Sequence, residues 1–410
     1  MKLLHTADIH LDSPLRSLAM RNSELCDAVA AATRASFSQL VDLAISEDVA
    51  ALLVAGDLFD GRERSARTGA FLMGELDRLG DAGIKVFYTK GNHDAENPIT
   101  GTLDLPAHVH VFDARGGREQ LAENVWIHGV SFADRHAPDS LLPRFKAPVP
   151  NAVNIAMLHS SLGGAAGHDV YAPCSVVDLA GMGFDYWALG HVHKRQIHSE
   201  MPWVVMPGIP QGRDIGEAGP KSVTLLTINH GRIDVSEKRT SVVEFAQSDL
   251  NITDADSDEA LRTMLRQHLA ALRRQIAAPT GVIRLSLSGR PSRHWQILRD
   301  HDVWLEQAGN LARAAGDLWI DKLLLDLTPP DAGTEAASAA EELAATMTQI
   351  RTEPGFVATA LDEVETVLQD LPPGLRDRLM PDEAARDDLV DRLALAGANR
   401  VLARMKGAVV

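Results

Sequence analysis

The sequence has little cysteine and no long apolar run, and both absences narrow its class. Only Cys26 and Cys174 occur in 410 residues, far apart and without a Cys-x-x-Cys pair, so neither a disulfide framework nor a thiolate zinc site is expected. No window approaches the roughly 20 apolar residues of a membrane span. Residues 1–20 also lack the basic and apolar regions of a secretory leader. We therefore expect a cytoplasmic chain with no membrane partner.

Positive charge is also scarce. The chain has 40 Lys and Arg against 56 Asp and Glu, which gives a formal net charge of −16. The excess is spread along the chain, since residues 1–250 hold 22 basic and 31 acidic residues and residues 251–410 hold the other 18 and 25. No basic tail or domain-wide positive field indicates a nucleic-acid partner. This evidence is weaker if bound cations neutralise some of the carboxylates.

Alternating helical and strand patterns over residues 1–245 predict a layered α/β domain, with a β-sheet core flanked by helices. Apolar residues recur at helical spacing over residues 23–46 and about 64–80. The run Val49–Asp57 has the near-continuous hydrophobicity of a strand buried on both faces, which is typical of sheets covered by helices. Further strands are expected at residues 2–8, 124–132, 153–161, 186–193, 203–207 and 222–228.

The remaining residues predict a different organisation. Residues 250–327 combine amphipathic helices with the alternating strand "VIRLSLS" and the strand "LWIDKLLLDL", as expected for a small α+β capping domain. Residues 328–340 are rich in Pro, Gly, Ser and Ala and are predicted to be a linker. Residues 341–410 predict C-terminal amphipathic helices. These helices either dock a partner or pack on their own domain, and both interpretations remain open.

Carboxylate, amide and imidazole side chains recur where the predicted strands give way to loops. Asp8 and His10 flank one residue, as do His191 and His193. In an extended segment residues i and i+2 project to the same side, so one metal ion can contact both members of a pair. Between the two pairs come Asp57, Asn92, His93, Asp94 and His159.

These residue types favour hard or borderline divalent metals, and the lack of thiolates argues against a structural zinc site. Two metals about 3.5 to 4 Å apart need a shared ligand, and Asp57 is the candidate bridge. Glycines at positions 56, 91 and 190 are expected to let the backbone turn tightly before each functional group. Taken singly, Asp8 could cap a turn and His159 could pack in a core. The ordered set favours a metal site over an inactive, degenerate relative.

The blocks "DIH", "GDLFD", "GNHD", the single His159 and "GHVH", in that order, resemble the signature of the calcineurin-like metallophosphoesterases. The resemblance covers about residues 1–240. Within that superfamily, "HTADIHLDSPL" and "AGDLFD" are most similar to the DNA-repair exonuclease branch, the nuclease subunits that work with a coiled-coil ATPase. The resemblance therefore implies a metallophosphoesterase fold for the first domain.

The resemblance also implies a set of ligands for each of two divalent metal ions. In this family the ions are usually Mn²⁺, and Fe²⁺ or Zn²⁺ occur in relatives. One ion would be held by Asp8, His10, Asp57 and His193. The other would be held by Asp57, Asn92, His159 and His191. His93 falls at the position that contacts the scissile phosphate and assists the leaving group, with Asp94 orienting it.

Several other polar residues lie near these blocks, and some of them allow two interpretations. Asp60 orients groups around Asp57 or caps the following helix. Asp12 is expected to hydrogen-bond its own loop backbone, and His5 to be structural. Basic side chains beside the blocks either contact substrate phosphates or are ordinary solvated residues; they are Arg62, Arg64, Lys194 and Arg195, with Arg213 further along.

The leading hypothesis is a metal-dependent DNA exonuclease or endonuclease in DNA repair, with a metal-activated water as nucleophile and His93 as leaving-group acid. The residues themselves indicate phosphoester hydrolysis, whereas the resemblance contributes DNA, an SMC-like coiled-coil ATPase partner and a homodimer. One alternative keeps the site but changes the substrate to a cyclic nucleotide or small phosphoester. Another is a scaffold subunit of an ATPase complex.

Overall fold

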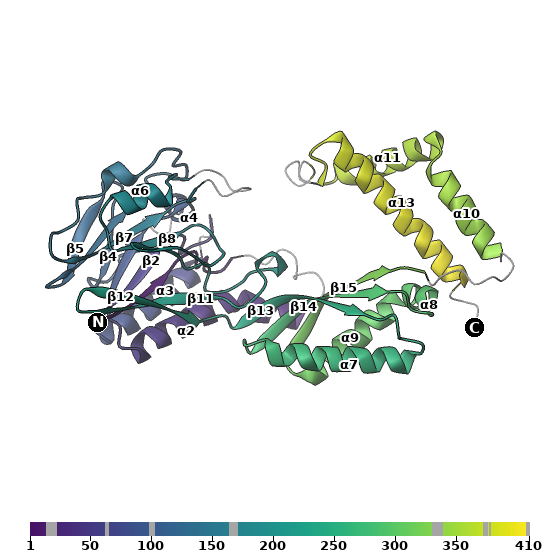
Figure 1. Cartoon of the computed structure of the whole chain (residues 1–410), viewed down its shortest axis with the longest axis horizontal. Coiled ribbons are helices and arrows are strands. Elements are labelled where there is room, and N and C mark those ends of the chain that lie inside the picture. The colour runs from purple at the N-terminus through teal and green to yellow at the C-terminus, as the bar shows by residue number, and fades with distance from the viewer. Residues whose placement is uncertain are drawn as a thin grey trace. The chain divides into compact units, whose positions relative to one another are not determined.

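The computed structural model describes residues 1–13, 23–61, 65–97, 103–163, 171–329, 339–371, 376 and 379–406. Arg62 and Arg64 lie outside the described residues. The chain divides into two compact units (Figure 1). The first comprises Met1–Gln247, Arg274–Ile283 and Asp317–Trp319, and the second comprises Ser248–Arg273, Arg284–Gly316 and Ile320–Val410. The domain boundaries expected from the sequence stay a prediction.

The first unit contains a six-stranded sheet in the order β12-β11-β1-β2-β3-β4. Its central strands β1, β2 and β3 run parallel to one another, and β1 pairs antiparallel with β11. Every residue of β2 is buried, as its continuous apolar run predicts. The strands are β1 (Lys2–Thr6), β2 (Ala51–Ala55), β3 (Lys85–Thr89), β4 (Val109–Val111), β11 (Ser222–Asn229) and β12 (Arg232–Arg239).

A second six-stranded sheet in the same unit has the order β5-β6-β7-β8-β10-β9. Its central strands β6, β7, β8 and β10 are parallel, and the two edge strands are antiparallel to their neighbours. The strands are β5 (Gly117–Ala122), β6 (Val125–Val130), β7 (Val153–His159), β8 (Tyr186–Gly190), β9 (Gln196–Glu200) and β10 (Trp203–Met206).

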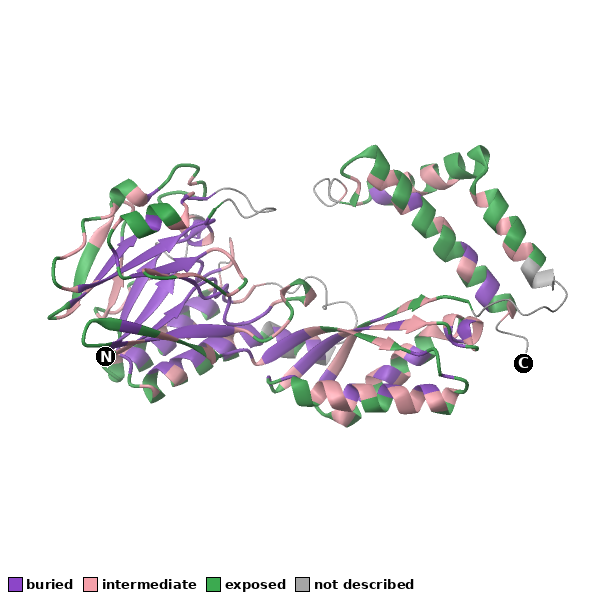
Figure 2. Ribbon diagram, viewed as in Figure 1, coloured by how far each residue is buried: buried purple, intermediate pink, exposed green. Residues whose placement is uncertain are grey.

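The two sheets pack face to face around one apolar cluster, to which Leu53 and Phe87 contribute from the first sheet and Ile155 and Tyr186 from the second. A separate cluster lies between the other face of the first sheet and helices α2 and α3. A third lies between the second sheet and α6. Figure 2 shows the buried strands between partly exposed helices. The predicted layered α/β fold is therefore confirmed, as helix, sheet, sheet and helix.

The helices of the first unit follow the sequence pattern with one interruption. The helix predicted over residues 23–46 is divided at Ala31, which forms a turn. The α-helices are α1 (Ser23–Ala30), α2 (Ala32–Ser46), α3 (Ala66–Asp81), α4 (Asn92–Glu96) and α6 (Val176–Gly181). Two short 3₁₀ turns are η1 (Leu142–Arg144) and η2 (Ile215–Glu217).

A three-stranded sheet in the order β13-β14-β15 has residues in both units, and the helices after residue 250 belong to the second. The strands are β13 (Val243–Asn251), β14 (Thr280–Gly289) and β15 (Leu318–Leu327). The helices are α7 (Asp258–Gln275), α8 (His294–Arg299), α9 (His301–Ala315), α10 (Ala339–Arg351), α11 (Pro354–Gln369) and α13 (Glu383–Lys406). Among the described residues, no helix has both the length and the apolarity needed to cross a membrane.

Glu47, at the C-terminal end of α2, joins two strands of the first sheet. Its carboxylate lies 2.8 Å from Lys2 Nζ and 2.5 Å from Lys238 Nζ. The hydrogen bonds from Lys2 and then Lys238 lower the pKa of Glu47 to about 2 from 4.5. Because the folded-state pKa is the lower one, the stabilisation is present above pH 4.5 and is lost as the pH falls towards 2.

Glu47→Gln should therefore lower the free energy of unfolding at pH 7 and have little effect near pH 2. Since the pairs are partly exposed and screened by solvent, the loss should be on the order of 1 kcal/mol or less. Denaturant unfolding of both proteins across this pH range measures the difference. An equal difference at pH 7 and pH 2 would contradict an electrostatic origin.

Candidate metal centre

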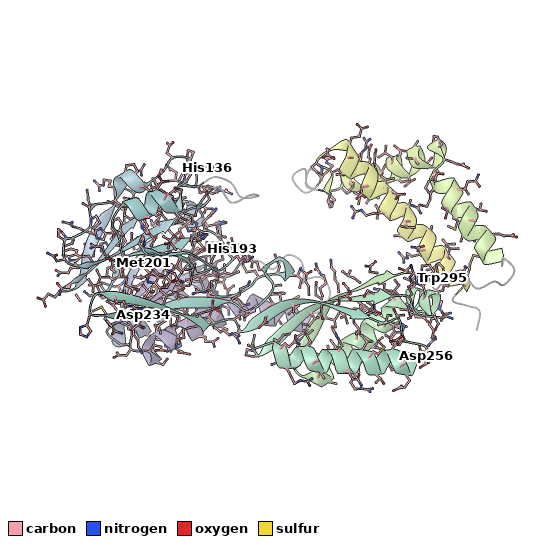
Figure 3. The ribbon with its side chains drawn as sticks, viewed as in Figure 1. His136, His193, Met201, Asp234, Asp256 and Trp295 are labelled. Atoms are coloured by element: carbon pink, nitrogen blue, oxygen red, sulfur yellow. The ribbon has the colours of Figure 1, made fainter. Side chains whose placement is uncertain are left out.

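The predicted ligands gather at the carboxyl ends of strands from both sheets. His159 is the last residue of β7, and its ring Nδ1 lies 3.0 Å from the carbonyl oxygen of Ala55, the last residue of β2. His193, labelled in Figure 3, lies on the loop after β8. Sites of open α/β sheets are built at this end of the strands. The described structure brings together all seven residues that the sequence predicts as ligands.

The backbone reaches this arrangement differently from the prediction. β1 ends at Thr6 and β8 at Gly190, so neither residue pair lies on a strand. Asp8 and His10 have φ of 52° and 47°, and His191 has φ of 98°. The expectation that strand alternation aligns the pairs is therefore wrong. Left-handed conformations cost non-glycine residues free energy and cluster at functional sites, and here they turn the side chains inward.

One half of the site surrounds His159. Its Nε2 lies 3.1 Å from Asn92 Oδ1 and 3.4 Å from Asp57 Oδ2. A carbonyl oxygen can only accept a hydrogen bond, so Nδ1 of His159 must donate its proton to the Ala55 oxygen. In the neutral ring Nε2 then carries a lone pair. That lone pair faces two oxygen acceptors. The three atoms repel one another unless a cation lies among them.

The charge of this half confirms the need for a cation. Burial opposes protonation of His159, but the carboxylates of Asp57 and Asp8 outweigh it and raise the pKa of His159 to about 9. Burial also disfavours the charged form of Asp8, and this raises the pKa of Asp8. With no metal bound, a proton on His159 supplies the missing positive charge. A divalent ion supplies more charge and satisfies all three acceptors.

The other half surrounds His10 and His193, whose Nε2 atoms are 3.2 Å apart. Two nitrogen ligands at about 2.1 Å from one metal ion lie roughly 3.0 to 3.4 Å apart, so this spacing suits a shared ion. Burial and then the Arg213 guanidinium lower the pKa of His10 well below its ordinary value. The His10 ring is therefore available as a neutral ligand.

Asp57 lies between the two halves. Its Oδ2 is 3.4 Å from His159 Nε2 and 4.0 Å from His10 Nε2, while its Oδ1 accepts a hydrogen bond of 3.0 Å from the backbone N–H of His93. Among the described residues, three sets of donor atoms, each within 4.8 Å, have the right chemistry for a metal ion; they are Asp8, His10 and His193, then Asp8, Asp57 and His159, and also His10, Asp60 and His93. The residues present thus fit a two-metal centre with Asp57 as the bridge, while the identity of the metal is not determined by them.

His191 contacts the site through both its backbone and its ring. Its N–H lies 3.1 and 2.9 Å from the two carboxylate oxygens of Asp8. Its ring packs against His159 at 5.1 Å and against Tyr171 at 5.3 Å between ring centroids. The buried Tyr171, which sequence reasoning did not single out, therefore packs against the His191 ring.

His93 and Asp94 follow Asn92 in the first turn of α4, next to the site. Gly61 N–H donates a 3.0 Å hydrogen bond to His93 Nδ1, so the neutral ring carries its proton on Nε2. Asp94 is buried, and its two oxygens accept from Phe59 N–H at 3.1 Å and Gly91 N–H at 3.0 Å. Burial, followed by the nearby Asp57 charge, raises the pKa of Asp94 to about 6. Asp94 thus joins the loops that carry Asp57 and His93.

The basic residues proposed for phosphate contact differ in position. Lys194 is exposed beside His193. Arg195 donates to Thr224 and lies 3.7 Å from Glu237, so its guanidinium contacts the first sheet. The phosphate assignment of both residues stays a prediction.

Two other polar residues of the first sequence block, Asp12 and His5, have contacts of their own. Asp12 accepts from Arg34 and Thr68, which ties its loop to α2 and α3 instead of to its own backbone. His5 is buried, where its Nε2 donates to Leu189 and its Nδ1 accepts from Tyr186, as a structural residue would. Burial lowers the pKa of His5 to about 3.

Sequence reasoning missed Glu217, which contacts a predicted ligand. Its Oε1 lies 2.7 Å from His193 Nδ1 and 2.8 Å from Arg213 Nη2. The surrounding stretch "GEAGPKS" carries no motif for this role, because its contact to His193 spans 24 positions and depends on tertiary packing. The sequence carried no signal that could have found it.

The glycines next to the ligands are required by close approach more than by turning. A Cβ on Gly190 would lie 2.0 Å from the Ala55 carbonyl oxygen and 2.9 Å from His159 Nδ1. A Cβ on Gly91 would lie 2.3 Å from Asp57 Oδ1. Of the three glycines predicted to turn, Gly56 has a positive φ, of 95°. The other two make room for the ligands.

The comparisons with known proteins agree with this geometry. Residues 1–195 match the family Calcineurin-like phosphoesterase, and residues 245–328 match Metallophosphoesterase YhaO, middle domain. The chain belongs to the calcineurin-like metallophosphoesterases, in the branch that contains YhaO and Mre11, as the signature blocks predict. It is therefore a member of a hydrolase family with residues suited to two metal ions.

The relatives define how far the similarity extends. The chain is 34% identical over 295 residues to the uncharacterized metallophosphoesterase YhaO of Bacillus subtilis, covering 70% of this chain and 72% of that protein. It is 28% identical to the DNA double-strand break repair protein Mre11 of Sulfurisphaera tokodaii, covering 48% of this chain and 50% of that one. Mre11 of Sulfolobus acidocaldarius is 29% identical with the same coverage. The chain thus spans about half the length of these Mre11 relatives.

Gly190→Ala should disrupt the centre, because the new Cβ cannot coexist with the Ala55 carbonyl and the His159 ring. We expect a loss of at least about 2 kcal/mol in the free energy of unfolding and a weakened metal site, measured by thermal unfolding and metal titration. Gly74→Ala in α3 is the matched control, since no atom lies within 4 Å of its Cβ position. That change should stabilise the helix by about 0.5 to 1 kcal/mol. Equal effects of the two variants would contradict the packing argument.

Proposed function

We propose that the chain is a two-metal phosphodiesterase that cleaves DNA in DNA repair. The observation that carries the reaction class is the convergence of seven oxygen and nitrogen ligands around Asp57, with acceptor atoms facing each other across the site. Such a set binds two divalent ions, for which we propose Mn²⁺, with Fe²⁺ or Zn²⁺ as alternatives. One ion takes Asp8, His10, Asp57 and His193, and the other takes Asp57, Asn92, His159 and His191.

When bound, two such ions neutralise phosphate oxygens and lower the pKa of bound water towards about 7. The chain's residues provide the remaining elements. Asp57 and Asp8 supply negative charge that holds the cations. The buried His10 is neutral, and His159 would give up its proton to bind a metal ion. His93 presents its Nε2 proton, because Gly61 occupies Nδ1. We assign that proton to the leaving-group oxygen, an effect typically worth about 10²- to 10⁴-fold.

The relatives support DNA as the substrate. The Mre11 proteins carry DNA double-strand break repair in their names, and the similarity to them covers 48% of this chain. The acidic composition gives weight to a second candidate, hydrolysis of a cyclic nucleotide or other small phosphodiester. A net charge of −16 repels a polyanion more strongly than a small substrate.

A partner is also part of the proposal. The C-terminal helices expose apolar side chains to solvent, including Val367 at 67%, Leu393 at 49% and Val401 at 45%. Exposed apolar residues on helices suit docking to another helix. We propose an SMC-like coiled-coil ATPase as this partner, and a scaffold role is compatible with hydrolysis.

One assay separates these functions. The purified chain is incubated with Mn²⁺ and, in separate reactions, with linear double-stranded DNA, single-stranded DNA, a cyclic nucleotide and a chromogenic phosphodiester. We expect release of nucleotides or fragments from DNA. Cleavage confined to the two small substrates would replace DNA with the second candidate. No cleavage of any substrate would leave the scaffold role.

Two variants test the roles within the site. His93→Ala should bind metal like the wild type and lose about 10²- to 10⁴-fold in kcat. Asp57→Ala should lose metal, because it removes the bridge. Isothermal titration with Mn²⁺ and initial rates measure the two effects.

His198→Ala is the control, since His198 lies on the edge strand β9 away from the ligands. It should match the wild type in both measurements. Full activity of both His93→Ala and Asp57→Ala would refute the site assignment.

A further inference from the structure

Glu217, in the loop after β10, contacts a side chain that carries a metal-site nitrogen. Its Oε1 is 2.7 Å from Nδ1 of His193, the ring whose Nε2 faces His10. Glu217 is largely buried, with 14% of its side chain exposed. Nothing in the calcineurin-like signature blocks includes this residue.

The short distance determines which ring atom carries the proton. A carboxylate oxygen and a ring nitrogen at 2.7 Å require a proton between them, so His193 Nδ1 donates to Glu217. Arg213 Nη2 also lies 3.2 Å from this nitrogen, but its shorter contact, of 2.8 Å, is the hydrogen bond that it donates to the same Glu217 oxygen. In the neutral ring Nε2 is then a lone pair, directed at the site. A carboxylate behind a histidine ligand is the usual way in which proteins set the tautomer, orientation and basicity of that ligand.

Arg213 holds Glu217 in place from the other side. The backbone N–H of Arg213 donates to Glu217 Oε2 at 2.8 Å, and its Nη2 donates to Oε1 at 2.8 Å. These hydrogen bonds fix the carboxylate in one orientation.

The same arginine continues towards the other side of the site. Arg213 Nη1 donates to Ser13 Oγ at 3.4 Å, and Ser13 Oγ donates to Asp60 Oδ2 at 2.9 Å. Asp60 Oδ1 lies 3.7 Å from His10 Nδ1 and 3.5 Å from His93 Nδ1. Among the described residues, His10 Nδ1 is buried without a hydrogen-bond partner. A chain of four side chains therefore runs from His193 to the neighbourhood of His10 and His93.

These contacts also reassign Arg213. The sequence places it beside the signature blocks, where a role in phosphate contact is one interpretation. The structure shows its guanidinium bound to Glu217 and Ser13 instead.

A simpler alternative is that Arg213 and Glu217, at i and i+4, only stabilise their own loop. That alternative leaves unexplained why the carboxylate oxygen nearest Arg213 Nη2 is the one that accepts from His193.

We infer that Glu217, held by Arg213, is a positioning residue that fixes His193 as a ligand of the first metal ion. The inference rests on the two-metal centre of the proposed function but is independent of the substrate. Without the carboxylate, the His193 ring loses the acceptor for Nδ1–H. It can then rotate or place its proton on Nε2, where no metal can bind.

Titration of the metal-free full-length chain with Mn²⁺ alone tests the inference. Glu217→Ala should weaken binding of one ion by about 10- to 100-fold. The ion held by Asn92, His159 and His191 should be affected much less. Replacing Mn²⁺ with Co²⁺ adds a spectroscopic readout, since its visible absorption changes when a nitrogen ligand is lost. Unchanged affinity and an unchanged Co²⁺ spectrum would overturn the inference.

Two further variants separate positioning from folding. Glu217→Gln keeps the size of the side chain and one acceptor oxygen for His193, but its NH₂ group cannot accept from the Arg213 backbone N–H as Oε2 does, so a smaller loss of affinity at the same ion is expected. Glu237→Gln is the matched control. Glu237 lies on β12 and pairs with Arg195, and within the described part of the chain it contacts no site histidine. It should bind both ions like the wild type. Equal weakening of both ions in Glu217→Gln would indicate a merely structural residue and refute the inference.

The DNA assay is run beside the titration so that the two claims fail separately. A wild-type chain that binds two ions but cleaves no DNA defeats the nuclease proposal and leaves the role of Glu217 in place. A chain that cleaves DNA while Glu217→Ala binds both ions normally defeats the role of Glu217 alone.

Discussion

The central constraint on this protein is the repulsion among buried acceptor atoms that share one small volume. Asp8 and Asp57 are 1% and 2% exposed, and His159 is fully buried with its Nε2 lone pair turned towards oxygen atoms. Burying such groups without positive charge is costly. Cations relieve the repulsion, and the surrounding fold keeps the acceptors in place until cations bind. The identity of the chain as a metallophosphoesterase follows from this balance.

The layered fold supplies the rigidity that the balance requires. Two sheets share an apolar core, and their outer faces are covered by helices, so the ends of β2 and β7 are held in register from both sides. The ligands themselves lie on loops with left-handed backbone conformations, which are strained for Asp8, His10 and Asp57. A well-packed core can hold such loops because their strain is small compared with the core's stabilisation. Gly91 and Gly190 remove the side chains that would keep the loops apart.

A layer of hydrogen bonds behind the ligands orders the histidines. Three site imidazoles have a defined acceptor or donor behind them: Ala55 for His159, Glu217 for His193 and Gly61 for His93. Each contact selects one tautomer, and with it whether the ring presents a lone pair or a proton to the site. His159 and His193 present lone pairs suited to metals. His93 presents a proton suited to a phosphate or a leaving group.

The sequence by itself determined the residue types and their order. Val49–Asp57 marked a buried strand followed by a carboxylate. The five signature blocks identified the family and predicted a ligand set, because metal chemistry restricts which side chains can serve. It did not determine the path of Asp8 and His10, which are paired by left-handed loop geometry and not by strand alternation. Nor could it reveal Glu217, whose partner lies 24 residues away. Tertiary structure decided these features, because hydrogen bonds between distant loops form only after the sheets have packed and brought the strand ends together.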